Sequence, residues 1–153
     1  MTHPPRPDHR SWSAALMVFI GGAAGTVSRE GLDLATPGDR LLYTTFLINI
    51  VGSFTLAVLY AALRSGAEAP AAERRLRLLV GTGFLGGFTT YGSFAVGVAA
   101  AGIRGSSADA ILYAVGSVVL GVGAALIGRW VVERATGRRP GGTRPAPETG
   151  STP

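Results

Sequence analysis

The side chains able to bind a ligand within the apolar stretches of this chain are neutral hydrogen-bonding groups. Among them are one amide, Asn49, and the hydroxyls of Thr90, Ser93, Tyr113 and Ser117. Such groups donate hydrogen bonds without carrying a fixed charge. They can replace part of the water around a small anion and still release it, which is the balance that ion conduction requires. The pattern therefore indicates a path for a small anion.

Two aromatic residues, Tyr91 and Phe94, stand three positions apart beside these hydroxyls. If a helix runs through this segment, both rings project from one of its faces. Aromatic rings have positive edges, against which an anion can rest. The alternative is that both rings face lipid, and their spacing alone leaves both interpretations open.

Asp, Glu, Lys, Arg and His are missing from the centre of every apolar stretch, and the chain has no cysteine. A proton-coupled carrier needs a titratable group at membrane depth to hold its proton. General acid–base catalysis and transition-metal binding need the same kinds of side chain. The sequence therefore disfavours a proton-coupled carrier for small cations, such as a small multidrug transporter, and predicts that the protein is not an enzyme.

The elements that position these residues follow from the distribution of charge. The 153-residue chain is 47% hydrophobic and 15% charged, and its charges leave four uncharged stretches of 18, 23, 26 and 19 residues. About 20 apolar residues of helix cross a hydrocarbon core of about 30 Å. A soluble helix bundle would show polar residues every three to four positions, and none of the stretches does. We predict an all-α membrane protein with four transmembrane helices at about residues 11–29, 41–63, 78–103 and 110–131.

These spans form one transmembrane domain, residues 11–136, between polar tails at residues 1–10 and 137–153 that we expect to be disordered. The first span also resembles a secretory signal, but Gly21 and Gly25, four positions apart, suit close helix packing better. The sequence pI is near 10.7, and all fourteen basic residues are Arg at the ends of spans. This distribution indicates contact with anionic lipid headgroups and not with nucleic acid.

The third span is expected to be broken near its middle. Residues 83–90 contain three glycines and two threonines, which weaken a helix. A straight helix of 26 residues would be about 39 Å long, more than the core requires. A break frees main-chain carbonyls, which are tolerated at membrane depth only inside protein or beside a polar cavity. Broken helices recur at ion sites, and carbonyl oxygens suit a hard monovalent cation such as Na⁺.

The arginines also predict the orientation. Three of them, Arg29, Arg40 and Arg104, belong to one side of the membrane. The other side carries eleven, namely Arg6, Arg10, Arg64, Arg74, Arg75, Arg77, Arg129, Arg134, Arg138, Arg139 and Arg144. Because basic residues stay on the cytoplasmic side, both termini are expected in the cytoplasm.

Three motifs together resemble the Fluc (CrcB) fluoride channels of bacteria. Residues 21–29 (GGAAGTVSR) are similar to the first-span motif of that family, and residues 45–54 (TFLINIVGSF) to its second-span motif. Residues 83–94 (GFLGGFTTYGSF) are similar to its most specific motif, in the third span. The three occur in order and at the right separations.

The resemblance implies a fluoride-selective channel in the bacterial cell membrane, built from two antiparallel subunits with two pores. Passive efflux would lower cytoplasmic fluoride. A structural Na⁺, not transported, would sit at the dimer centre on the main-chain carbonyls of Gly86 and Thr89. The pore or fluoride-binding positions would be Asn49, Thr90, Tyr91, Ser93, Phe94, Tyr113 and Ser117.

Three departures from the family pattern bear on conduction. Tyr91 replaces a usual Phe, Gly92 a usual Ser, and Gly97 stands where many members have Glu. They raise an alternative, a non-conducting membrane subunit that folds and orients a channel-forming partner. The arginine bias should also fix one orientation, so that an antiparallel dimer would need an oppositely oriented chain. A heterodimer with a second family member is therefore a further hypothesis.

Overall fold

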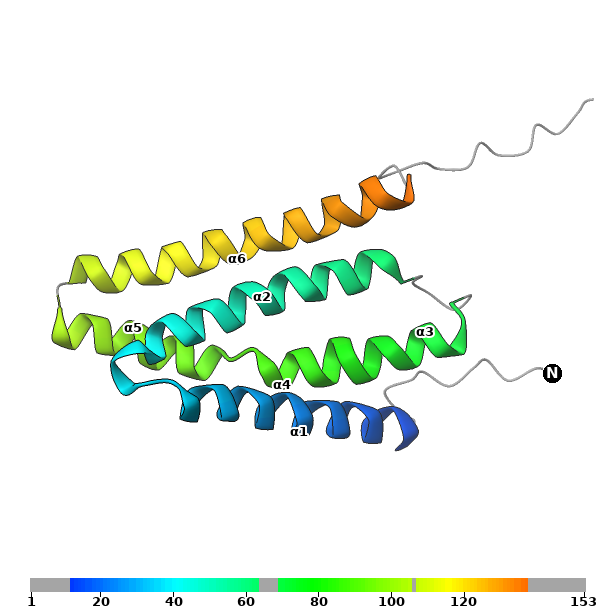
Figure 1. Ribbon diagram of the computed structural model, residues 1–153, viewed down its shortest axis with the longest axis horizontal. Helices are drawn as coiled ribbons and strands as arrows, with labels where there is room; N and C mark the ends of the chain where they lie inside the picture. The colour runs from blue at the N-terminus through cyan, green and yellow to red at the C-terminus, as the bar shows by residue number, and fades with distance from the viewer. Residues whose placement is uncertain (1–11, 64–68, 106, 138–153) are drawn as a thin grey trace, which may run out of the picture.

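The computed structural model describes residues 12–63, 69–105 and 107–137, and every regular element in these ranges is a helix (Figure 1). This confirms the predicted all-α class. Both predicted tails, apart from Gly137, lie outside the described residues. The elements are α1 (Trp12–Ala35), η2 (Gly38–Arg40), α2 (Leu41–Ala62), α3 (Ala71–Leu76), η3 (Arg77–Leu85), α4 (Gly86–Phe88), α5 (Tyr91–Arg104) and α6 (Ser107–Thr136).

The long helices lie side by side with their axes roughly along one direction (Figure 1). α6 packs along α2 and also contacts α5, while α1 packs along η3 and α4. The segments α3, η3 and α4 follow one another as a nearly continuous rod, in which η3 is a π-helix. π-Helical turns are rare and often mark functional sites. The third segment, α3 to α5, therefore contacts α1, α2 and α6.

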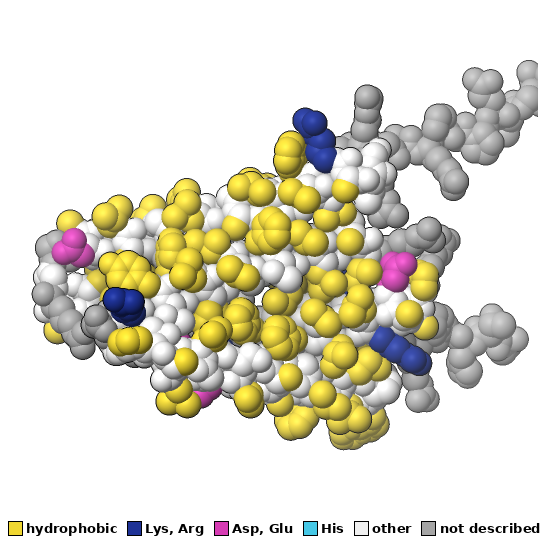
Figure 2. Space-filling view, viewed as in Figure 1, with side chains coloured by type: hydrophobic (Ala, Val, Ile, Leu, Met, Phe, Trp, Pro, Cys, Tyr) yellow, Lys and Arg dark blue, Asp and Glu magenta, His cyan; other side chains and the backbone are white. Residues whose placement is uncertain are grey.

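Three helices are long and apolar enough to cross a membrane among the described residues. They are Leu42–Ala62, Ala71–Ile103 and Ser107–Thr136, and none of the most apolar part of the last is buried. Large hydrophobic side chains are exposed along all of them, and on the face in Figure 2 they cover the middle while charged side chains lie toward the ends. A surface of this kind is solvated by lipid, so the chain is a multi-pass membrane protein. The glycine-rich α1 is not among the three.

Several helices extend beyond the uncharged stretches that predicted them. α1 continues past Arg29 to Ala35, and α6 continues past Arg129 to Thr136. An absence of charge marks where hydrocarbon is crossed, but a helix can continue among the headgroups, where charged side chains pair along it. Arg29 contacts Asp33 at 3.1 Å in this way, four residues along the same helix.

Glycines bring α1 close to the third segment. A side chain on Gly21 would collide with the Leu79 carbonyl, and one on Gly25 with the Phe84 carbonyl. From the other side, a Cβ on Gly83 would lie 2.9 Å from the Val18 carbonyl oxygen. Small residues at this spacing let two helix backbones touch. The predicted use of the α1 glycines in packing agrees with these contacts.

Candidate functional site

Two extended residues separate α4 from α5. Thr89 has φ −78° and ψ 154°, and Thr90 has φ −146° and ψ 124°. Their β-branched side chains favour extended backbone. Thr89 still donates from its N–H and its hydroxyl to the Leu85 carbonyl, at 3.0 and 2.8 Å. The helical hydrogen bonds are therefore lost after Thr89, and we call the extended pair Thr89–Thr90 the interruption.

Asn49, from α2, satisfies both polar atoms of the Thr90 backbone. Its Nδ2 donates to the Thr90 carbonyl at 3.2 Å, and its Oδ1 accepts from the Thr90 N–H at 3.0 Å. A peptide group that loses its helical partners in an apolar surrounding must find others. The amide provides one donor and one acceptor, which no hydroxyl or carboxylate side chain does with the same geometry. Asn49 thus holds the interruption in place.

Thr90 in turn caps α5. Its hydroxyl oxygen accepts from the Ser93 N–H at 3.2 Å, and its hydroxyl lies 3.4 Å from Ser93 Oγ. An N-cap threonine satisfies one of the amides left free in the first turn of a helix. Thr90 therefore acts first as a structural residue, and its hydroxyl is already engaged.

These two contacts divert the donors of two carbonyls. A continuous helix would direct the Thr90 N–H to the Gly86 carbonyl and the Ser93 N–H to the Thr89 carbonyl. The first N–H donates to Asn49 and the second to the Thr90 hydroxyl instead. Gly86 and Thr89 are the two residues expected to bind Na⁺. The loss of their helical N–H donors fits this expectation, because it frees two carbonyl oxygens and hard cations prefer oxygen ligands.

Aromatic rings follow the interruption in a row. Phe94 stacks on Tyr113 with centroids 5.9 Å apart and planes at 23°, and the Tyr91 ring lies 6.1 Å from Phe94 with its plane tilted by 44°. Tyr91 is 82% exposed, so one end of the row faces away from the bundle. Phe46 completes the row, 6.4 Å from Tyr113. The predicted pair at positions 91 and 94 is therefore joined by a third ring from α6.

The hydroxyls of α6 are engaged within the chain. Tyr113 donates to the Leu42 carbonyl at 3.3 Å, and Ser117 donates to the Tyr113 carbonyl at 2.7 Å. Serine commonly bonds to the carbonyl four residues earlier in this way. An anion would meet these hydroxyls as donors only after they turn from their present acceptors. No local sequence signal identifies the Leu42 carbonyl as a partner.

A groove of about 750 Å³ collects most of the predicted site. Seven of the nine predicted residues line it: Asn49, Gly86, Thr89, Thr90, Tyr91, Phe94 and Ser117. Ser93 and Tyr113 do not line it. Gly52 also lines the groove, and a side chain there would collide with Thr89 Cγ2. Sequence reasoning missed this function of Gly52, although a glycine three residues after Asn49 is a signal of close contact. Among the residues that the structure describes, no charged side chain lines this groove.

The amino-acid sequence is similar to those of one known protein family. The family described as CrcB-like protein, Camphor Resistance (CrcB), matches residues 16–129. The chain is 38% identical over 123 residues to the fluoride-specific ion channel FluC 2 of Leifsonia xyli, covering 80% of this chain and 85% of the relative. It is 39% identical over 122 residues to the fluoride-specific ion channel FluC of Hyphomonas neptunium, covering 78% and 94%. It is 38% identical over 120 residues to the fluoride-specific ion channel FluC 2 of Bacillus subtilis, covering 78% and 88%.

Proposed function

Because this chain belongs to the CrcB family, we propose that it is a subunit of a fluoride channel in the bacterial cell membrane. The channel passes fluoride down its gradient and so lowers cytoplasmic fluoride. The protein is accordingly not an enzyme. The relatives named above carry the assignment to fluoride, and the residues around the interruption support it.

The observation that carries the proposal is the neutral groove built on the Asn49–Thr90 contact. Asn49 uses one N–H of its amide on the Thr90 carbonyl, and the amide has two. The second N–H and the positive edges of the Phe94 ring are groups that attract an anion without trapping it. Since a fixed positive charge would hold fluoride too long, a path lined without charge favours passage.

The aromatic row supports the same path. Phe94 contacts both Tyr91 and Tyr113, with centroids at 6.1 and 5.9 Å. These contacts restrict the rotation of the Phe94 ring, whose positive edge would attract an anion. Ser117, one turn beyond Tyr113 on α6, is the next hydroxyl along the path.

A structural Na⁺ forms part of the proposal. The carbonyls of Gly86 and Thr89, whose helical donors are diverted, would hold it together with the same carbonyls of a second subunit. A cation there would neutralise the dipoles of carbonyls whose usual helical donors bond elsewhere. Gly86 supports this arrangement, because a Cβ built on it meets nothing within 4 Å and its side of α4 is open.

The proposed assembly is an antiparallel dimer whose subunits cross the membrane four times. α1 supports the fourth crossing, because its 24 residues span about 36 Å and pack along η3 and α4. Lipid surrounds the exposed apolar faces. Both termini are assigned to the cytoplasm on the arginine bias, although six of the eleven arginines on that side lie outside the described residues.

The same bias favours a heterodimer with an oppositely oriented family member. A cysteine-accessibility assay tests it, with single cysteines placed in loops on each side of the membrane. One orientation for the chain expressed alone supports the heterodimer. Labelling of each cysteine from both sides would mean that the chain pairs with its own copies.

A second candidate is a non-conducting subunit that folds and orients a conducting partner. Gly97 favours this second candidate, because it contributes no polar side chain to the path. Neighbouring side chains occupy the space beside it: a Cβ on Gly97 would lie 2.8 Å from Leu42 Cδ2 and 3.2 Å from Tyr113 Cε1. Gly92 likewise contributes no hydroxyl.

One experiment separates the two candidates. Purified chain is reconstituted into liposomes loaded with fluoride, and a fluoride electrode records release once a K⁺ ionophore removes the opposing potential. Release with the chain alone establishes conduction. Release only when a partner chain is added would favour the non-conducting role or the heterodimer, and no release in either case would overturn the channel proposal.

A further inference from the structure

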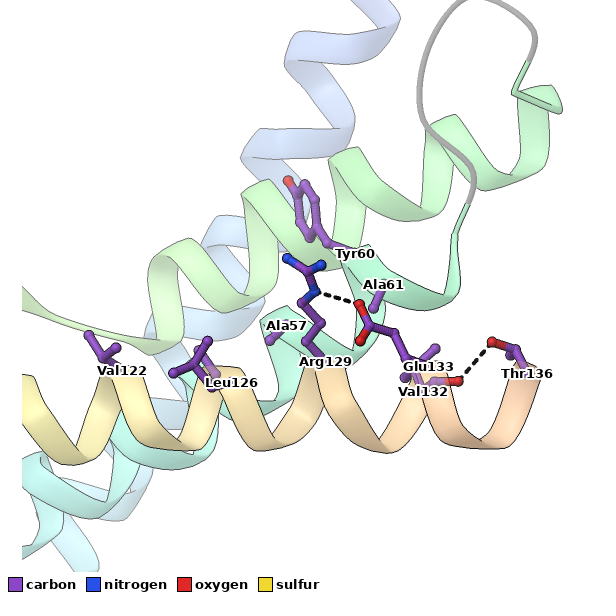
Figure 3. A pocket seen from close by; sticks show the side chains of 10 residues that line it. Ala57, Tyr60, Ala61, Val122, Leu126, Arg129, Val132, Glu133 and Thr136 are labelled. Atoms are coloured by element: carbon purple, nitrogen blue, oxygen red, sulfur yellow. Dashed lines mark hydrogen bonds and ion pairs between the residues drawn. The ribbon is translucent and has the colours of Figure 1, made fainter. Parts of the chain in front are cut away.

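The groove beside the interruption continues toward one end of the bundle. A second groove of about 540 Å³ lies between α2 and α6 (Figure 3). Three residues line both grooves: Tyr60, Val122 and Ala125. The first groove holds Asn49 and Ser117, and the second ends near the C-terminal end of α6. The two grooves therefore adjoin, and together they form a depression that extends along α2 and α6 toward this end of the bundle.

One face of α6 lines this depression. Ser117, Gly121 and Ala125 line the first groove and Ala125 and Arg129 line the second, each four residues after the last. Residues four apart share a face of an α-helix. Gly121 and Ala125 have no polar side chain, so Arg129 is the next residue on this face, after Ser117, that could attract an anion.

The Arg129 side chain is held but not buried. Its Nε donates to Glu133 Oε1 at 2.6 Å, and the two side chains are 56% and 25% exposed. In Figure 3 the guanidinium projects into the space between α6 and α2, toward Tyr60. The guanidinium carbon of Arg77, from η3, lies 4.4 Å from the centroid of the Tyr60 ring. The Tyr60 ring therefore has Arg77 over it and lies on the side toward which Arg129 projects, and Glu133 pairs with Arg129.

We propose that Arg129 is an anion-recruiting residue at the outer end of the groove, and that Glu133 moderates its strength. The inference rests on the proposed function, because the ligand is the permeating small monovalent anion. A cation at a narrow mouth raises the local concentration of anions and so the rate at which they reach the neutral site. The ion pair keeps Arg129 in position, while the nearby carboxylate lowers the potential that an anion meets and prevents tight binding.

The test compares three single variants in the fluoride-release assay at low and high ionic strength. Arg129→Gln should slow release about threefold at about 10 mM salt. In water, a unit charge about 6 Å from the permeating anion attracts it by about 0.7 kcal/mol, which is a factor of about three in local concentration. Glu133→Gln should speed release by a similar factor, because it removes the opposing charge. Both effects should vanish at about 1 M salt, where the Debye length is about 3 Å.

Arg134→Gln is the matched control. Arg134 lies on the same helix at the same end of the bundle, but its guanidinium carbon stacks 4.9 Å from the Trp130 ring and it does not line the groove. Its loss should leave release unchanged. Equal slowing by Arg129→Gln and Arg134→Gln would overturn the proposal. It would mean that the summed positive charge of the arginines, and not Arg129 itself, attracts the anion.

Unchanged release in Arg129→Gln would show that this end of the groove is not the mouth, and the channel itself would stand. Because Arg129 is exposed, the variant is expected to fold, which a thermal unfolding curve checks. An absence of release by the wild-type chain, alone and with a partner, would instead remove the proposed function. The two failures are therefore distinguishable.

Discussion

The Asn49 amide and the Thr90 backbone form two hydrogen bonds with each other across 41 residues of sequence, at 3.0 and 3.2 Å. The pair replaces the helical bonds that extended residues cannot make. It also releases the Gly86 carbonyl from its usual donor. The Asn49 side chain of α2 therefore contacts the interruption, borders the proposed cation site and lines the groove that an anion would follow.

Asn49→Asp should slow fluoride release by about tenfold or more. The carboxylate can accept from the Thr90 N–H but cannot donate to the Thr90 carbonyl, and an unpaired buried carbonyl costs about 1–3 kcal/mol. The new negative charge would also repel the anion from the groove. Release from liposomes measures the effect, and thermal unfolding in detergent shows whether the chain remains folded.

Thr55→Val serves as the control for that variant. Thr55 is a polar residue of the same helix, and its hydroxyl donates at 2.8 Å to the Val51 carbonyl of that helix. Its loss should leave release within about twofold of wild type, since such bonds contribute little. If Asn49→Asp conducts as well as Thr55→Val, the Asn49–Thr90 contact has no part in conduction.

Gly25→Ala should destabilise the fold. The added methyl group would meet the Phe84 carbonyl, so α1 would have to move away from η3. Overpacking of this kind costs about 1–3 kcal/mol. Gly31→Ala, on the same helix, meets nothing within 4 Å and should stabilise by about 0.5–1 kcal/mol, because alanine favours helix. Opposite shifts of the unfolding midpoint are expected, and equal shifts would contradict the close packing of α1.

The helices could be predicted because lipid imposes a simple rule. A backbone in hydrocarbon must bond to itself, so a long uncharged stretch predicts a helix almost regardless of its side chains. The rule predicts a crossing by α1 less clearly, because its glycines lower its hydropathy. The spacing of Gly21 and Gly25 nevertheless predicts close helix packing. Helix ends were less predictable, because pairs such as Arg129 and Glu133 let a helix continue among charges.

The candidate site residues are a prediction from sequence, whereas their contacts follow only from the structure. Hydroxyls and amides in apolar stretches indicate a polar site, which is why Ser117 and Asn49 are predicted to belong to it. Which partner each one takes depends on distant backbone. Ser117 donates to its own helix, and Asn49 to a residue of another segment, although both are neutral donors in apolar stretches.

Removal of Na⁺ should abolish release if the Gly86 and Thr89 carbonyls hold a structural cation. The chain is purified and reconstituted throughout with N-methylglucamine in place of Na⁺. Release should fall by about tenfold or more and return when Na⁺ is added at constant ionic strength, because oxygen ligands built for a small hard cation have no substitute in an organic one. Equal rates in both preparations would remove Na⁺ from the proposal.

Gly97→Glu restores a side chain that many family members have, yet it should lower release in this chain. The space is occupied: a Cβ at this position would lie 2.8 Å from Leu42 Cδ2 and 3.2 Å from Tyr113 Cε1. The new side chain would displace Tyr113, break its 3.3 Å hydrogen bond to the Leu42 carbonyl and remove the ring that stacks on Phe94. Overpacking of this kind costs about 1–3 kcal/mol of folding stability. We expect release to fall by about tenfold, and release from liposomes measures the effect.

The double variant Gly97→Glu with Tyr113→Ser should recover part of the loss, because the smaller side chain makes room for the glutamate. Residues in contact show such non-additive effects, whereas distant ones add. Gly102→Glu is the control on the same helix, since a Cβ there meets its nearest atom, Ala110 Cβ, at an ordinary 3.6 Å. Release above wild type in Gly97→Glu alone would mean that Tyr113 yields easily, and that this chain conducts below its capacity for want of a carboxylate.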